Sequence, residues 1–211
     1  MKISLDSVGK RFNREWLFRA FTYEFTTGNY YAITGPNGSG KSTLLQVIAG
    51  ATLHNEGKID YAIEDRVLPE DTIYRYISIA APYLELIEEM TLFEFLDLHD
   101  KLKGWTETVN TTMIIKILGL QSSASKQLRY FSSGMKQRVK LAQAIFSNVK
   151  VILLDEPNTN LDTDGIELYH QLVQEYCKNQ LVIVSSNDKN EYDFCNHLID
   201  IQKYKVSPTL N

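Results

Sequence analysis

The sequence predicts an α/β fold built around a mostly parallel β-sheet. Two observations carry this prediction. An apolar run at 30–33 is followed by a glycine-rich turn at 35–40 and by a segment with helical periodicity at 44–49, which gives a strand, a turn and a helix in succession. A second run, 149–154, is almost purely branched aliphatic, as is typical of a strand covered on both faces of a parallel sheet. With 211 residues and 44% hydrophobic content, the chain is long enough to bury a substantial core.

Two antiparallel strands are expected before the glycine-rich turn. Residues 3–8 and 17–25 alternate apolar and polar side chains, as half-buried strands do. A turn from Gly9 to Arg14 is expected between them. Phe12 falls in this polar stretch, where little core is available to it. Two interpretations stay open from the residues alone: Phe12 stacks on an adenine ring, or it folds back onto the small sheet.

The middle of the chain is expected to insert helices between strands. Residues 57–63 favour a further strand of the antiparallel sheet, and 77–80 a buried strand. From Pro82 the pattern becomes helical and places one apolar face on each of two segments. These faces comprise Leu92, Phe95, Leu96 and Leu102 in the first segment and Val109, Met113, Ile117 and Leu120 in the second. His99 falls on the first face, where a hydrogen-bonded core histidine is favoured over a catalytic one.

The glycine-rich turn has the spacing G-x-x-x-x-G-K-S, which is the Walker A pattern of phosphate-binding loops. Such a loop turns backbone N–H groups toward phosphate oxygens, and the helix that follows adds its positive dipole end. Lys41 is expected to reach the β- and γ-phosphates, and Ser42 to ligate Mg²⁺. The residues expected to hold the nucleotide are Gly35, Pro36, Asn37, Gly38, Ser39, Gly40, Lys41, Ser42 and Thr43.

Two carboxylates, Asp155 and Glu156, follow the second aliphatic run. Active groups in parallel sheets sit at the carboxyl ends of strands, so both arrive where a ligand is expected. Asp155 is predicted to hold Mg²⁺, directly or through water, and Glu156 to orient and deprotonate the water that attacks the γ-phosphate. An acidic pair after a strand is by itself also typical of a turn or a helix start. Downstream of a Walker A loop, it favours the catalytic interpretation.

Four segments together resemble the nucleotide-binding subunit of an ATP-binding-cassette (ABC) transporter, and the resemblance covers nearly the whole chain. They are G-P-N-G-S-G-K-S at 35–42, F-S-S-G-M-K-Q-R at 131–138, V-I-L-L-D-E-P at 151–157 and T-N-L-D at 159–162. The second corresponds to the family signature, usually L-S-G-G-Q, which distinguishes this family from other P-loop ATPases.

The resemblance implies a P-loop NTPase core with a mostly parallel sheet, an N-terminal antiparallel β subdomain and an inserted helical subdomain. The chain would be a single ABC ATPase domain over 1–211. Its nucleotide-binding core would comprise 1–81 and 136–211, and its helical subdomain 82–135.

The resemblance also implies residue roles. Ser132, Ser133 and Gly134, at a helix start, would contact the γ-phosphate of ATP bound to a second subunit, so that two chains close head to tail over two nucleotides. Asp162 takes the position of the family's D-loop at that interface, although it equally favours the start of the next helix. Phe12 takes the position of the adenine-stacking aromatic. The basic residues that follow the signature are expected to be mostly solvated: Lys136, Arg138 and Lys140.

Two positions depart from the family pattern. Pro82 or Tyr83 stands where the family has a glutamine that senses Mg²⁺ and water and links the site to the membrane partner, and Asn187 stands where a histidine precedes Asp188. Asn187 can donate a hydrogen bond to the γ-phosphate or to water, but it carries no charge and exchanges no proton near neutral pH. Losing one preorganised transition-state contact costs about 10²–10³ in rate. ATP binding and dimer closure are therefore better supported than fast hydrolysis.

The function implied by the resemblance is hydrolysis of MgATP by a head-to-tail dimer that drives a separate membrane permease, and the S-S-G-M signature resembles those of small exporters. The formal charge of −4 argues against a nucleic-acid partner. No apolar run approaches the ~18 residues that span a bilayer, and no signal peptide opens the chain, so we expect a cytoplasmic protein held at the inner membrane face by its permease. Two alternatives stay open: a regulatory or mechanical ABC ATPase without a permease, and a weakly hydrolysing half of a heterodimer.

Overall fold

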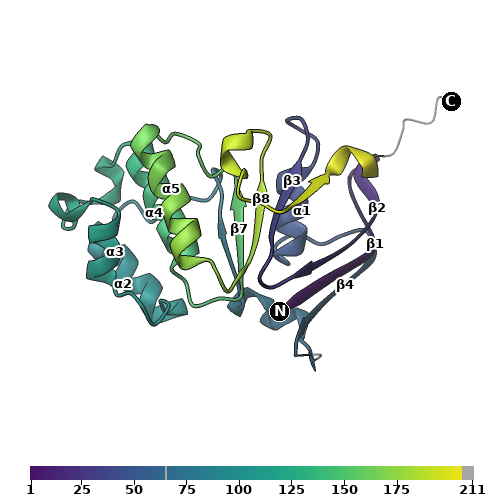
Figure 1. Cartoon of the computed structure of the whole chain (residues 1–211), viewed down its shortest axis with the longest axis horizontal. Coiled ribbons are helices and arrows are strands. Elements are labelled where there is room, and N and C mark those ends of the chain that lie inside the picture. The colour runs from purple at the N-terminus through teal and green to yellow at the C-terminus, as the bar shows by residue number, and fades with distance from the viewer. Residues whose placement is uncertain (65, 206–211) are drawn as a thin grey trace.

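The computed structural model describes residues 1–64 and 66–205, so the end of the predicted domain range, 206–211, lies outside the described residues. A parallel sheet runs through its centre with the strand order β6-β7-β8-β3-β9 (Figure 1). Its strands are β3 (Tyr30–Thr34), β6 (Ile77–Ala80), β7 (Val151–Asp155), β8 (Leu181–Ser185) and β9 (His197–Asp200). Every residue of β7 and β8 is buried, as their aliphatic runs require. The predicted α/β fold with a mostly parallel sheet is confirmed.

A second, antiparallel sheet has the strand order β2-β1-β4-β5. Its strands are β1 (Lys2–Phe12), β2 (Glu15–Thr26), β4 (Glu56–Ile63) and β5 (Arg66–Val67). The turn predicted from Gly9 to Arg14 is wrong at its start, because β1 continues pairing until Phe12 opposes Glu15. Asn13 takes a left-handed φ of 53°, which allows a tight two-residue connection. Irregular register between Leu5 and Arg11 breaks the simple alternation that marks a strand in the sequence.

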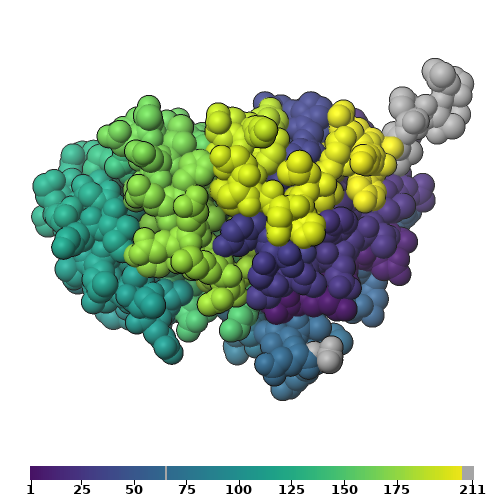
Figure 2. Space-filling model, in the orientation of Figure 1, coloured from purple at the N-terminus to yellow at the C-terminus, as the bar shows by residue number. Residues whose placement is uncertain are grey.

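The helices form two groups on opposite faces of the parallel sheet (Figure 1). They are α1 (Lys41–Ile48), α2 (Leu92–Lys103), α3 (Thr111–Ile117), α4 (Ser133–Ile145) and α5 (Thr163–Tyr176). Helix α1 lies between the two sheets, and its Leu44 and Leu45 are buried in one core with Phe21 of β2 and Ile183 of β8. Helices α2 to α5 share the other core and form the opposite end of the molecule, coloured teal to green in Figure 2.

The apolar faces predicted for the helical segment are only partly correct. Leu102 is 77% exposed, although Leu92, Phe95 and Leu96 are buried as expected. Lys103, three helical turns after Leu92, occupies that face instead and donates from Nζ to the carbonyl of Ile77 at 2.5 Å.

The second predicted face is also only partly correct, since Leu120 is buried and Val109 and Ile117 pack against the core as expected. Met113 is 45% exposed, whereas Ile114 and Ile115 are buried. Helix α3 is short and starts at Thr111 after an Asn110 cap. The position of this cap determines which side chains face the core.

His99 is hydrogen-bonded, as predicted, but it is only half-buried and lies at the edge of the core. Its Nε2 lies 2.8 Å from Ser147 Oγ, and Gln143 Nε2 lies 3.1 Å from its Nδ1. The ring stacks on Trp105 with centroids 4.7 Å apart. Burial, with a smaller contribution from the charge of Lys103, lowers the pKa of His99 to about 4, so the ring is neutral near pH 7.

Within the described residues, no helix has the length and apolar character needed to cross a membrane.

Candidate functional site

The phosphate-binding pattern forms a tight loop between β3 and α1. Gly35 has φ of 146°, and a Cβ there would lie 2.9 Å from side-chain atoms of both Ser39 and Ile201, so only glycine fits. Lys41 is buried, and its Nζ donates to the carbonyls of Gly35 at 2.8 Å and Pro36 at 3.3 Å. The ammonium is therefore held inside the loop at the start of α1, where unpaired helix N–H groups favour an anion.

Asp155 ends β7 beside this loop and fits a Mg²⁺ site. Its side chain is buried, and Oδ1 has no hydrogen-bond partner among the described residues. Burial raises the pKa of Asp155, while the nearby hydroxyls of Ser185 and Ser42 and the charge of Lys41 lower it in part. A buried carboxylate with an unpartnered oxygen and serine hydroxyls nearby is a donor set that suits a hard divalent cation.

Glu156 and Phe12 border the same cleft, which has a volume of about 290 Å³. The cleft is lined by Phe12, Leu17, Asn37, Gly38, Gly40, Lys41, Ser42, Thr43 and Glu156. Glu156 has a left-handed φ of 45°, a conformation that costs a non-glycine residue about 1 kcal/mol or more. Its N–H donates to the carbonyl of Ser185 at 2.9 Å, which helps to hold this backbone. Phe12, 53% exposed, stands at the rim with the Lys10 ammonium 4.8 Å from its ring centroid.

Asn187 reaches the phosphate loop from the end of β8. Its Nδ2 donates to Asn37 Oδ1 at 3.1 Å, so the structure brings it into contact with a residue that lines the cleft. Tyr83, by contrast, is 46% exposed and lies in the segment after β6. Burial raises the pKa of Tyr83, a hydrogen bond with Gln46 lowers it and the charge of Asp155 raises it, which places the phenol near Asp155. Pro82 is fixed by Lys140, whose Nζ donates to its carbonyl at 2.9 Å.

The signature residues lie at the start of α4, apart from the residues that line the cleft. Ser132 caps the helix, since its Oγ accepts from the N–H of Met135 at 3.2 Å, and Ser133 is the first helical residue. Gly134 lies against backbone, because a Cβ there would be 2.9 Å from the carbonyl oxygen of Asn160. Their predicted contact with a second subunit's nucleotide stays a prediction.

Asp162 starts a helix, as one interpretation had it. Its Oδ1 caps α5 by accepting from the N–H of Gly165 at 2.9 Å, and it also accepts from Arg138 Nη2 at 2.9 Å. Its predicted place at a subunit interface stays a prediction.

The expectation that the basic residues of α4 are mostly solvated is wrong. Arg138 binds Asp162, Lys140 binds the carbonyl of Pro82, and Lys136 pairs with Glu88. Arg138 reaches the loop after β7, and Lys136 and Lys140 both reach the connection between β6 and α2. A sequence pattern cannot show these contacts because both segments are distant from the helix in the chain. Helix α4 therefore holds the segments that follow β6 and β7.

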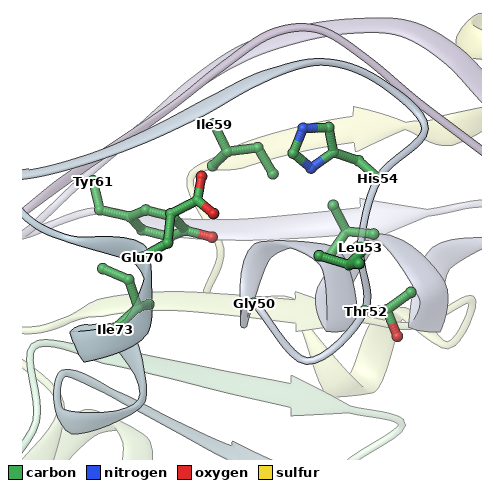
Figure 3. A pocket seen from close by; sticks show the side chains of 9 residues that line it. Gly50, Thr52, Leu53, His54, Ile59, Tyr61, Glu70 and Ile73 are labelled. Atoms are coloured by element: carbon green, nitrogen blue, oxygen red, sulfur yellow. The ribbon is translucent and has the colours of Figure 1, made fainter.

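A smaller cavity of about 60 Å³ lies near the other end of α1 (Figure 3). His54, Tyr61 and Glu70 point toward it, but the Tyr61 hydroxyl is already used by the carbonyl of Ile48 at 2.9 Å. The space holds only a few water molecules. The cleft beside the phosphate loop is thus the better candidate for a nucleotide.

Residues 18–159 match the family described as ABC transporter. The ABC transporter ATP-binding protein YybJ of Bacillus subtilis (strain 168) is 29% identical over 90% of this chain and 87% of its own length. HrtA of Staphylococcus aureus (strain Newman), named as a hemin import ATP-binding protein, is 26% identical over 95% of each chain.

Solved structures agree with these relatives. An ABC transporter ATP-binding protein from Pyrococcus furiosus shares the fold with a TM-score of 0.82 at 24% identity, over 98% of this chain and 100% of that one. The ATP-binding cassette MJ0796, in a dimeric post-hydrolysis state with ADP and Pi, has a TM-score of 0.79 at 25% identity over 94% of both chains. Since the family match covers more than half of the residues, this chain belongs to the ABC transporter family, as an ATP-binding protein with the ABC ATPase fold.

Proposed function

We propose that the chain binds MgATP in the cleft beside the phosphate loop, closes head to tail with a second ABC ATPase subunit and hydrolyses the γ-phosphate to drive a separate membrane permease. The observation that carries this proposal is the arrangement around one cleft, which Lys41 and Glu156 line. Asn187 binds Asn37 of the cleft wall, and Asp155 lies close to Lys41 and Ser42. The family's ATPase activity and the dimeric state of MJ0796 support it.

The residues of the cleft divide the work of hydrolysis. On ATP binding, the Lys41 ammonium exchanges the carbonyls of Gly35 and Pro36 for phosphate oxygens. Asp155 and Ser42 hold Mg²⁺, which when bound neutralises charge on the β- and γ-phosphates.

Glu156 orients a water molecule in line with the γ-phosphorus and takes its proton. A bond forms from the water oxygen to phosphorus while the bond to the oxygen bridging to ADP breaks. Asn187 donates a hydrogen bond to the γ-phosphate or the water.

The phosphate-binding assignment is tested with Lys41→Ala. The variant loses the only ammonium group among the residues that line the cleft, so calorimetry should show MgATP affinity reduced by at least about tenfold. Lys58→Ala, at an exposed lysine paired with Asp60, is the control and should bind as the parent does. A Lys41→Ala protein with the parent's affinity would remove the nucleotide assignment.

The general-base assignment is tested with Glu156→Gln. The amide still orients water but accepts no proton, so turnover should fall by about 10²–10³ while ATP binding persists. An ATP-bound dimer should then accumulate, and light scattering after gel filtration measures it. Glu107→Gln, at an exposed carboxylate, is the control. Unchanged turnover in Glu156→Gln contradicts the base role.

In the dimer, Ser132, Ser133 and Gly134 contact the nucleotide of the second subunit. The start of α4 supports this, because its first-turn N–H groups and dipole favour a phosphate. These residues lie apart from the chain's own cleft, which is the arrangement that a head-to-tail closure needs. Asp162 stands at the same interface, held by Arg138.

The permease binds in a groove of about 220 Å³ beside the segment that follows β6. The groove is lined by Ile77, Ser78, Ile79, Leu84, Glu85, His99, Lys103, Gln143 and Ala144. With this partner, the proposed location of the chain is the cytoplasm, at the inner face of the membrane. Copurification of a multi-span membrane protein with the tagged chain tests the assignment, and purification of the chain alone favours a regulatory ABC ATPase instead.

Export is the proposed direction, because the S-S-G-M signature with a basic residue downstream resembles those of small exporter ATPases. HrtA is named for import, so the direction needs its own measurement. Inverted vesicles that contain the permease and accumulate cargo on ATP addition support export, and right-side-out accumulation contradicts it.

A heterodimer is the second candidate arrangement. The observation that favours it is the pair of departures at Pro82 or Tyr83 and at Asn187, since a partner that carries the usual glutamine and histidine would complete one active site. The subunit stoichiometry of the purified complex decides between the two arrangements.

A further inference from the structure

The loop 157–162, which follows Asp155 at the end of β7 and the adjoining Glu156, is held from one side by α4. Gln137 is buried, and its Nε2 donates to the carbonyl of Pro157 at 2.8 Å. Gly134 lies directly against the carbonyl of Asn160, with no room for a side chain between them. The start of α4 therefore rests on the loop, and a displacement of the loop displaces the helix.

Glu191 holds the same loop from the other side. Its Oε1 accepts from the N–H of Asn158 at 2.7 Å, and the side chain is only 5% exposed. Its backbone is fixed as well, because its carbonyl accepts from the Tyr169 hydroxyl at 2.7 Å and its N–H donates to the carbonyl of Asp188 at 3.0 Å. Glu191 is thus a rigid connection between the loop and the segment that follows β8.

That segment also carries Asn187, which touches Asn37 of the phosphate loop. Burial raises the pKa of Glu191, hydrogen bonds from Ser186 and Asn158 lower it, and the charges of Asp188 and Glu156 raise it further. Burying a carboxylate is costly, and a single backbone N–H needs no more than a neutral acceptor. A buried carboxylate at this position is explained if the connection serves the site as well as the fold.

We propose that Glu191 is a positioning residue for ATP hydrolysis, which fixes the loop 157–162 to the segment that carries Asn187. The inference rests on the proposed function. A shift of Asn187 at the nucleotide passes through Glu191 to Asn158 and on to Gly134 at the start of α4. Because that helix start faces the second nucleotide in the proposed dimer, Glu191 couples the two sites.

The test compares two substitutions that keep the volume of the side chain. Glu191→Gln still offers an oxygen to Asn158, whereas Glu191→Met cannot accept a hydrogen bond. We expect Glu191→Met to lower kcat by about tenfold or more with KM for ATP within about twofold, since misplacement of reacting groups acts on the chemical step. Its Hill coefficient for ATP should fall toward one. Glu191→Gln should keep most of the parent's kcat and Hill coefficient.

Thr111→Val provides the matched control for a merely structural effect. It removes another buried hydrogen bond, from Trp105 Nε1 to Thr111 Oγ1 at 3.1 Å, in the helical segment. All variants are assayed at temperatures where melting curves show them folded. A Glu191→Met protein with the parent's kcat and Hill coefficient, or a Thr111→Val protein with the same losses, overturns the proposal.

Two further measurements separate this inference from the proposed function. If the parent chain shows no turnover, the proposed hydrolysis fails, and ATP-driven dimerisation in the Glu156→Gln background tests Glu191 instead: adding Glu191→Met should weaken the dimer, and an unchanged dimer refutes the coupling. Hydrogen exchange of the parent needs no substitution. The Asn158 amide should be protected, and rapid exchange there overturns the proposal.

Discussion

Replacing Asn187 by histidine should make the ATPase faster, and more so at low pH. The side chain of Asn187 already reaches the phosphate loop, where its Nδ2 lies 3.1 Å from Asn37 Oδ1. A histidine at this exposed position has room to point the same way. Below its ordinary pKa of about 6.5 the imidazole carries a positive charge, which the neutral amide of Asn187 never does.

The size of the effect follows from the change in the hydrogen bond. A hydrogen bond between neutral groups contributes about 0.5–1.5 kcal/mol net, and one to a charged group about 1.5–3 kcal/mol. The charged imidazole therefore stabilises the transition state by an additional ~1.4 kcal/mol, which corresponds to about tenfold in rate. Asn187→Ala removes the neutral contact and should lower kcat by a few-fold up to about tenfold.

Steady-state phosphate release from pH 6 to pH 8 measures both variants against the parent. The ratio of kcat for Asn187→His to that of the parent should approach about ten at pH 6 and decline as pH rises through about 6.5. Asn190→His, on the exposed turn nearby, controls for an unspecific effect of a new imidazole. Asn187→His that is no faster at any pH, together with Asn187→Ala that equals the parent, refutes a role for this position in hydrolysis.

Three other changes test separate parts of the structure. Phe12→Ala should weaken ATP binding by about 1–3 kcal/mol through the loss of base stacking but leave tripolyphosphate binding unchanged. Calorimetry with both ligands checks this, and an equal loss of binding free energy for ATP and tripolyphosphate contradicts it. Gly134→Ala places a Cβ 2.9 Å from the Asn160 carbonyl oxygen, so ATP-driven dimerisation should weaken. In urea the free energy of unfolding of the variant should fall by about 1 kcal/mol, although alanine favours a helix more than glycine does. An unchanged free energy of unfolding contradicts the clash. His99 has a pKa of about 4 in the folded protein and about 6.5 in the unfolded chain, so the unfolded chain binds the proton first as pH falls. The parent should therefore lose up to about 2 kcal/mol of its free energy of unfolding between pH 6.5 and pH 4, a value already reduced for the partial exposure of the ring. His99→Gln should lack this decline, and parallel urea midpoints for parent and variant across that range refute it.

Local patterns were enough to predict the two chemical landmarks. The loop at 35–42 and the carboxylates Asp155 and Glu156 each follow a strand whose apolar run is visible in the sequence. Since parallel strands bring their carboxyl ends to one edge, the meeting of both landmarks at one cleft also followed from the fold class.

The remaining features depend on contacts between distant segments. Lys103 replaced Leu102 on the buried face of α2 because β6 offered a carbonyl at that point. Glu191 meets Asn158 only because the loops after β7 and β8 lie side by side, and a lone glutamate in a polar stretch carries no signal of this. The basic residues of α4 were misjudged for the same reason.

The strand order has a consequence for the time at which the nucleotide site appears during synthesis. Strand β3, which leads into the phosphate loop, pairs on one side with β8 through Tyr30 and Val182 and on the other with β9 through Tyr31 and His197. Both neighbours are translated about 150 residues after it, so β3 keeps two open edges while nearly all of the chain emerges from the ribosome. Such late, long-range pairing of parallel strands is slow and prone to aggregation. The first motif to be synthesised is therefore among the last to become a working site, and substitutions in β8 or β9 should reduce the yield of folded protein more than their distance from the ATP cleft suggests.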